Sequence, residues 1–290
     1  MHKIEQAIQL FLENIEKAEV PDELIEEFGE NCKKAIRECL LSKRSEEPFS
    51  LRMSNIGRPL RSLMLDKLYG RVPMAANQKL RMTYGYIWES FMFFLLKSSG
   101  LNIETNKKVT LDINYDGENK LTVDGTFDLK FDGDIYDVKS ASSWSFDNKF
   151  VSLDSLMQDD TFGYVGQGIG YSLADKSPFG GWIVIDKSDG RIKVVPVPKE
   201  GYRALAVKYL NDFKHKIKTL NTPDAKLPPC EGEIDETFNR KLTGNKCLTK
   251  SCEFCPHKEK CHPGLTYKPE INSKAQNRKW KFYTKVKSGS

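Results

Sequence analysis

Five aspartates and two lysines lie within one short stretch, residues 123–140, which reads VDGTFDLKFDGDIYDVKS. Apolar and polar residues alternate on both sides of Asp132-Gly133. This dipeptide favours a two-residue hairpin turn, because Asp and Gly both tolerate positive φ. A hairpin with this turn sets Asp128 directly opposite Asp137, and we expect their Cβ atoms roughly 5 Å apart.

Two carboxylates that face each other across a strand pair repel unless a cation lies between them. Mg²⁺ or Mn²⁺ fits this role, because both ions take carboxylate oxygens and can also bind phosphate. Lys139, on the same face as Asp137, could orient or help deprotonate a metal-bound water and offset charge on a phosphate. The alternative is a solvent-exposed charged face, on which Lys130 and Lys139 neutralise the aspartates.

Four of the seven cysteines cluster in residues 247–261, CLTKSCEFCPHKEKC, and the others are scattered. Clustered cysteines in an intracellular chain indicate metal binding more often than disulfides. The spacing Cys-x4-Cys-x2-Cys-x5-Cys suits a 4Fe–4S cluster or a tetrahedral Zn²⁺. The predicted ligands are Cys247, Cys252, Cys255 and Cys261, with His257 and His262 as alternatives.

Composition limits the class of protein. The chain has 290 residues, 29% of them charged and 39% hydrophobic, which is typical of a globular fold. Its longest apolar run, Tyr86–Leu96, is too short to span a bilayer, and its first residues predict an amphipathic helix instead of a signal peptide. We therefore expect a cytoplasmic protein without a membrane partner.

A net charge of +5 does not by itself indicate a nucleic-acid partner. In Lys274–Lys287, however, cations alternate with aromatic residues, which suits either a nucleic-acid contact or a solvated tail.

The order of elements predicts an α/β fold. Helical patterns cover residues 1–70, 80–99, 157–174 and 199–220, whereas alternation predicts strands at 107–113, 120–131 and 134–140 and a hairpin at 180–197. We expect an N-terminal helical region (1–79), a core (80–220) and a Cys-rich metal-binding element with a basic tail (221–290).

Several motifs then resemble one family. GTFD (Gly125–Asp128) and IYDVKS (Ile135–Ser140) resemble the Gly-x-x-Asp … Asp-x-Lys signature of the PD-(D/E)XK nucleases, in the RecB-like branch that includes the CRISPR-adaptation exonucleases. GYIWES (Gly85–Ser90) is similar to the helix motif that supplies a Glu, here Glu89. QGIGY (Gln167–Tyr171) resembles the Gln-x-x-x-Tyr motif, and CEFCPHKEKC resembles the cysteine end of the iron–sulfur members.

The resemblance implies a restriction-endonuclease-like core, in which helices flank a central mixed sheet. It implies a Mg²⁺- or Mn²⁺-dependent DNA exonuclease of bacteria or phages, acting on single strands or DNA ends in recombination, repair or phage DNA processing, and working with DNA and a protein partner. Asp128, Asp137, Glu89 and the Val138 carbonyl would hold the metal, and Lys139 would position the attacking water. Gln167, Tyr171, Arg58 and Arg61 would contact the DNA.

One departure concerns the cysteines. Iron–sulfur members draw their first cysteine from the segment upstream of RPLR, but the corresponding MSNIGRPLRSL has none, so Cys247 is the predicted substitute. Alternatives also remain for the site and the activity. Glu89, Gln167 and Tyr171 could be ordinary polar helix positions. The chain could be a non-catalytic DNA-binding or scaffold protein on the same fold, or an endonuclease.

Overall fold

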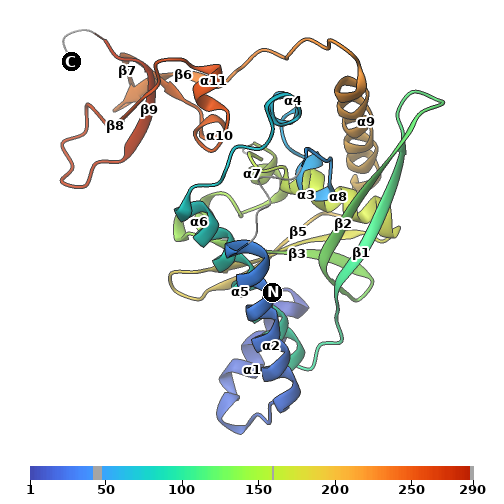
Figure 1. Ribbon diagram of the computed structural model, residues 1–290. Helices are drawn as coiled ribbons and strands as arrows, with labels where there is room; N and C mark the ends of the chain where they lie inside the picture. Colours follow the sequence, from blue (N-terminus) through green and yellow to red (C-terminus); the bar gives the residue numbers. More distant parts are fainter. Residues whose placement is uncertain (42–47, 159, 288–290) are drawn as a thin grey trace.

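The computed structural model describes residues 1–41, 48–158 and 160–287. It is an α/β structure in which helices flank a five-stranded mixed sheet, and a second, four-stranded antiparallel sheet follows near the C-terminus (Figure 1). In the first sheet the strands are adjacent in chain order, and only β3 and β4 run parallel. These strands are β1 (Glu104–Asn114), β2 (Lys120–Phe131), β3 (Asp134–Ala141), β4 (Phe179–Asp186) and β5 (Ile192–Pro196).

The remaining elements complete the chain as follows. The helices are α1 (Lys3–Glu13), η1 (Ile15–Lys17), α2 (Asp22–Ala35), η2 (Ile36–Leu40), α3 (Met53–Ile56), α4 (Leu60–Tyr69), α5 (Ala76–Ser98), α6 (Ser143–Asn148), α7 (Leu153–Gln158), α8 (Tyr164–Asp175), α9 (Tyr202–Asn221), α10 (Lys250–Glu253) and α11 (Lys258–Cys261). The second sheet contains β6 (Glu233–Phe238), β7 (Lys241–Leu248), β8 (Thr266–Pro269) and β9 (Trp280–Lys285). Among the described residues, no helix is both long and apolar enough to cross a membrane.

The predicted hairpin register is confirmed. Asp132 and Gly133 have φ of 53° and 88°, as a two-residue turn of this type requires. The ladder pairs Phe131 with Asp134 and Leu129 with Tyr136. Beyond that pair the Val138 amide donates a hydrogen bond of 2.7 Å to the Asp128 carboxylate. At this point a side chain, and not a backbone carbonyl of β2, accepts the hydrogen bond from β3.

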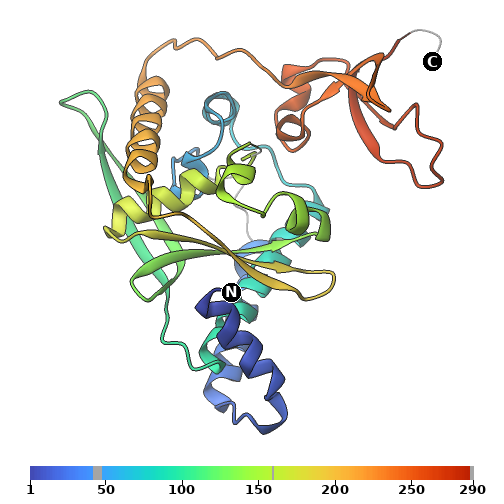
Figure 2. The same cartoon turned by 180° about the vertical axis from the view of Figure 1, so that it is seen from behind.

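Both faces of the first sheet are buried, although the hairpin pattern predicted one core face. Phe127 and Ile135 belong to the core under α3, α8 and α9, whereas Tyr136 and Val138 pack with α1 and α5 (Figures 1 and 2). The prediction missed this because β3 pairs in parallel with β4 at the centre of the sheet, and central parallel strands are covered on both sides. The face that carries Asp137 and Lys139 therefore lies under α8.

A buried carboxylate fastens the end of α8 to the sheet. Asp175 lies 2.9 Å from Lys107 Nζ of β1 and 2.8 Å from Lys130 Nζ of β2, and Ser177 Oγ donates a hydrogen bond of 2.7 Å to it. Burial alone would raise the pKa of Asp175, but these three donors outweigh it and lower the pKa to about 2. The contacts hold the end of α8 against β1 and β2, at one side of the sheet.

We expect Asp175→Asn to destabilise the protein by about 2 kcal/mol at pH 7. Because the folded-state pKa is depressed, this stability is present above the unfolded value near 3.8 and is lost as the pH falls through about 2. Urea unfolding at pH 7, 4 and 3 should show the difference from wild type narrowing with acidity. The control is Asp132→Asn, which breaks an exposed pair with Lys3 and should leave stability nearly unchanged, because water screens exposed ion pairs. A constant difference across this pH range would contradict the assignment.

The predicted basic tail is largely a β-strand. β9 pairs with β7 and β8, and the buried Glu236 of β6 ties the sheet together. Its carboxylate accepts hydrogen bonds from Tyr283 Oη (2.8 Å), Asn245 Nδ2 (2.8 Å) and Thr243 Oγ1 (2.9 Å). Burial opposes the charge of Glu236, yet these donors hold its pKa below the usual value. Pairing with the distant β7 and the hydrogen bond from Tyr283 to Glu236 of β6 fix the position of β9, and local composition does not contain that information.

Candidate functional site

A cavity of about 670 Å³ opens between α5, the β2–β3 hairpin and α8. Six predicted site residues line it, from elements far apart in the sequence: Glu89 of α5, Asp128 of β2, Val138 and Lys139 of β3, and Gln167 and Tyr171 of α8. Asp137 is 1% exposed beside Lys139 and belongs to the same electrostatic group. The structure thus brings together the acidic, basic and helix motifs that the sequence separates.

The two aspartates sit in a crowded, buried environment. Burial raises the pKa of Asp128 well above its usual value, and the nearby charges of Glu89 and Asp137 raise it further. Burial likewise raises the pKa of Asp137, against the opposing effect of Lys139. Among the described residues, no hydrogen-bond donor reaches the buried Asp137 Oδ1. Carboxylates held in this way favour binding of either a proton or a cation.

Lys139 is the cation closest to this group. Its Nζ lies 2.6 Å from Asp137 Oδ2 and 4.8 Å from the centre of the Tyr164 ring. Burial alone would lower the pKa of Lys139, but the charges of Asp137 and Asp128 outweigh it and raise the pKa. In this arrangement Lys139 is a stable positive charge and not a base.

Glu89 adds a third carboxylate from α5. Burial is the main reason why its pKa is raised to about 7, with Lys139 opposing and Asp137 adding to the shift. Glu89 lies eight residues after Arg81 and four after Gly85, so all three face the cavity from one side of the helix. Arg81, Arg52 and Lys34 also line the cavity, and the motif search did not select them. The spacing of Arg81, Gly85 and Glu89 at i, i+4 and i+8 could have predicted that Arg81 lies on the same helix face as Glu89.

Gln167 and Tyr171 act as one unit on α8. Gln167 Nε2 donates a hydrogen bond of 3.1 Å to Tyr171 Oη, and the Tyr171 side chain packs edge-on against Phe127. Gly125 of the GTFD motif allows this packing. A Cβ at position 125 would lie 2.5 Å from Met53 Cβ and 2.8 Å from Tyr171 Cε1. The glycine therefore lets α3 and α8 approach β2 just ahead of Asp128.

Arg58 and Arg61 lie elsewhere, on the side of α4 that contacts the Cys-rich element. Arg58 pairs with buried Asp66 at 2.9 Å, and Asp66 Oδ1 lies 2.7 Å from His257 Nε2. Arg61 Nε donates to Cys261 Sγ at 3.3 Å, and its Nη1 donates to the Pro228 carbonyl. Neither arginine lines the cavity of Asp128 and Lys139. Both are engaged in contacts within the protein, and their contact with DNA stays a prediction.

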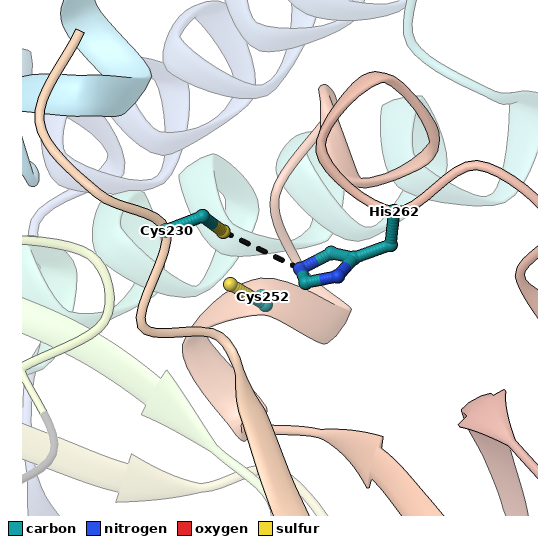
Figure 3. A group of neighbouring side chains, drawn as sticks. All are labelled: Cys230, Cys252 and His262. Carbon is teal, nitrogen blue, oxygen red and sulfur yellow. Dashed lines mark hydrogen bonds between the residues drawn. The ribbon is translucent and has the colours of Figure 1, made fainter.

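A second group of side chains could hold a metal ion. The ligand atoms of Cys230, Cys252 and His262 lie within 4.8 Å of one another, and the three side chains converge in Figure 3. Cys230 Sγ is 3.3 Å from His262 Nε2. Within the described residues this is the one set of three Cys, His, Asp or Glu residues that comes so close together.

The structure corrects the predicted ligand set at one position. Cys247 lies in β7, paired with Ile234 and Tyr283, and its buried thiol is near Lys281 and Glu236 instead of the other cysteines. Cys230, in the segment before β6, takes the fourth position. Cys252 and Cys261 both interact with it, and Cys255 lies close enough to influence Cys252. Sequence spacing favoured Cys247 because it is close to the other three cysteines along the chain. Pairing of β7 with β6 and β9 instead buries its side chain within the second sheet.

Burial and neighbouring charges both shift the pKa values of the thiols. Burial is the main cause that raises the pKa of Cys252 to about 11, and the neighbouring Cys230 adds to it. Burial also raises the pKa of Cys261, whereas its hydrogen bond from Arg61 favours the thiolate. A cavity of about 500 Å³ lies beside Cys230, Cys252, Cys255 and Cys261.

Comparisons with known proteins find similarity to solved structures alone. No protein-family model matches the chain, and no curated protein matches it. Among solved structures, one titled "Crystal structure of SSO0001" aligns with 81% of this chain and 96% of its own, with 17% identity and a TM-score of 0.47.

Proposed function

We propose that this protein is a Mg²⁺- or Mn²⁺-dependent DNA nuclease of the PD-(D/E)XK superfamily, in the RecB-like exonuclease branch. The observation that carries the proposal is the cavity lined by Asp128, Lys139 and Glu89 from two strands and a helix, with Asp137 buried against Lys139. The five-stranded mixed sheet flanked by helices is compatible with a restriction-endonuclease-like core.

The residues present fit a divalent cation. Buried Asp137 Oδ1 receives no hydrogen bond from the described residues. Asp128 and Glu89 line the same cavity as Lys139, which contacts Asp137. Asp128 and Asp137 would hold the ion, with the Val138 carbonyl and Glu89 as further oxygen ligands. A bound ion would make water a stronger nucleophile and neutralise developing phosphate charge.

The other groups act on the substrate. Lys139 keeps its proton, so it can orient a water and offset negative charge on the phosphate. Gln167 and Tyr171 form the opposite wall and can hold the bound strand. Lys34, Arg52 and Arg81 give the cavity additional positive charge that suits a phosphodiester backbone.

Digestion of end-labelled DNA tests the proposal. We expect wild-type protein to degrade a labelled single-stranded oligonucleotide with Mn²⁺ and to leave it intact with EDTA. Progressive shortening from one end indicates an exonuclease, whereas discrete internal fragments indicate an endonuclease of the same fold. Binding without cleavage in Mn²⁺ and in Mg²⁺ would sink the nuclease proposal and favour the non-catalytic alternative.

For the second group, we propose a structural metal centre held by Cys230, Cys252, Cys255 and Cys261, with His262 as an alternative ligand. The ligand atoms of Cys230, Cys252 and His262 lie within 4.8 Å of one another, and the thiols of Cys255 and Cys261 are close enough to influence Cys252 and Cys230. Thiolates are the ligands that both iron–sulfur clusters and structural zinc prefer. Such a centre would stabilise the Cys-rich element against α4, where Arg61 already contacts Cys261.

A further inference from the structure

Three aromatic side chains form a continuous exposed patch on the second sheet. The rings of Tyr267 and Phe282 lie 4.4 Å apart between centroids, and those of Tyr267 and Trp280 lie 5.1 Å apart. Tyr267 faces Phe282 directly across the β8–β9 pair, so the three side chains share one face of the sheet. Tyr267 and Trp280 are each 55% exposed. We call these three residues the aromatic patch.

The aromatic patch lies in the most basic part of the chain. Residues 263–287 contain seven of the 45 Lys and Arg residues but only one of the 40 Asp and Glu residues. The segment therefore has a net charge of +6, against +5 for the whole chain. Six of its seven basic side chains are exposed, namely Lys268, Lys274, Arg278, Lys279, Lys285 and Lys287. The seventh, Lys281, is paired with Glu236 and Glu270.

A further cation reaches the patch from α11. Lys258 Nζ lies 4.8 Å from the centre of the Phe282 ring. One side of the patch therefore carries a positive charge next to a ring face, while Trp280 and Tyr267 remain open to solvent at the other side. Exposed rings next to a lysine match the chemistry of a nucleotide, which combines an aromatic base with a phosphate.

We propose that the aromatic patch is a binding platform for single-stranded DNA, on which bases stack against Trp280 and Tyr267 while neighbouring lysines contact the phosphates. The proposal goes beyond the nuclease activity, because it assigns a separate binding surface outside the cavity of Asp128 and Lys139. Binding at this surface needs no metal ion and no cleavage.

The observations favour a single strand over other occupants. Stacking requires exposed base faces, which a single strand offers and a duplex hides within its own stack. A stable protein partner usually covers about 800 Å² on each side. Three partly exposed rings supply about 300 Å², if half of the 150–250 Å² of each ring is available. The surrounding net charge of +6 further favours a polyanion.

Fluorescence anisotropy with a labelled 12-nucleotide oligo-dT tests the platform. The full-length chain carries Asp137→Asn, and the buffer contains EDTA, so that the probe stays intact. We expect Trp280→Ala and Tyr267→Ala each to weaken binding about tenfold or more, and Trp280→Phe to keep most of the affinity. Lys279→Gln should lower the slope of log affinity against log salt by about 0.7. Melting temperatures should stay near that of the parent, because both rings are largely exposed.

The matched control is Trp144→Ala, since Trp144 of α6 is 52% exposed, close to the 55% of Trp280. An equal loss of affinity in Trp144→Ala and Trp280→Ala, or unchanged affinity in both patch variants, would overturn the platform. A change of oligomeric state in Trp280→Ala without a change in DNA affinity would assign the patch to a protein contact and overturn it as well. Failure of wild-type cleavage in Mn²⁺ overturns only the nuclease proposal, because binding is measured without metal.

Discussion

Replacing Asp137 by Asn is expected to lower the rate of Mn²⁺-dependent DNA digestion by on the order of 10³-fold. The change keeps the shape of the side chain but removes its charge, and Asp137 Oδ1 is the buried carboxylate oxygen without a donor. With one negative charge fewer, Asp128 and Glu89 retain Lys139 as their counter-ion but lose the partner needed for a shared divalent ion. Single-turnover digestion of an end-labelled oligonucleotide measures the effect.

Although Asp137→Asn should lower the activity, it should not lower the stability of the fold. Because burial raises the folded-state pKa of Asp137, its ionisation opposes folding at neutral pH. We therefore expect Asp137→Asn to melt at the same temperature as wild type or higher at pH 8 in EDTA, and to lose any advantage as the pH falls and the wild-type carboxyl takes up its proton. The control Asp134→Asn changes the same residue type in the same strand, at the hairpin turn, and should keep full activity. More than a tenth of wild-type activity in Asp137→Asn would remove Asp137 from the site.

Cys230→Ser is expected to abolish metal binding by the Cys-rich element. The wild-type chain should carry one metal centre, seen either as a broad brown absorption band of an iron–sulfur cluster or as one zinc per colourless chain. Metal content by mass spectrometry should fall to background in Cys230→Ser and in Cys252→Ser. Since structural metal binding contributes to folding free energy, both variants should also become more sensitive to proteases between β6 and β9.

The control for this experiment is Cys247→Ser. Cys247 is buried in β7 away from the other thiols, so its replacement should cost about 1–3 kcal/mol of stability through an unpaired hydroxyl but keep the metal. Loss of metal from Cys247→Ser together with full retention in Cys230→Ser would restore the ligand set expected from spacing. Cys247→Ser thus tests the ligand predicted from spacing along the chain, and Cys230→Ser tests the ligand indicated by the folded structure.

The sequence was sufficient where short-range rules decide the structure. The Asp132-Gly133 turn determined the hairpin register next to the turn, from Phe131–Asp134 to Leu129–Tyr136, whereas the predicted direct pair of Asp128 with Asp137 lies beyond the end of this ladder. The spacing of Gln167 and Tyr171 predicted a shared helix face, and the two side chains are hydrogen-bonded. Each of these inferences needed only the geometry of one turn or one helix.

Long-range pairing accounts for what the sequence did not reveal. Cys230 joins Cys252 through the fold of the C-terminal element, and Cys247 is removed from them by pairing with Tyr283. Arg58 and Arg61 are basic residues of the kind expected near DNA. In the structure, however, Arg58 pairs with Asp66, and Arg61 donates a hydrogen bond to Cys261, which is distant in the chain. Local patterns carry no record of such partners.

The separations along the chain have a kinetic consequence. From Asp128 to Tyr171 the site belongs to one continuous stretch, β2 to α8, and Glu89 precedes it on α5. The docking of the Cys-rich element depends instead on Arg61 meeting Cys261 and Asp66 meeting His257, which are 200 and 191 residues apart. Contacts that close short loops form faster than those that close long ones. We expect the acidic cavity to assemble early during synthesis. The contact between Asp66 and His257 can form only after the Cys-rich element has been synthesised.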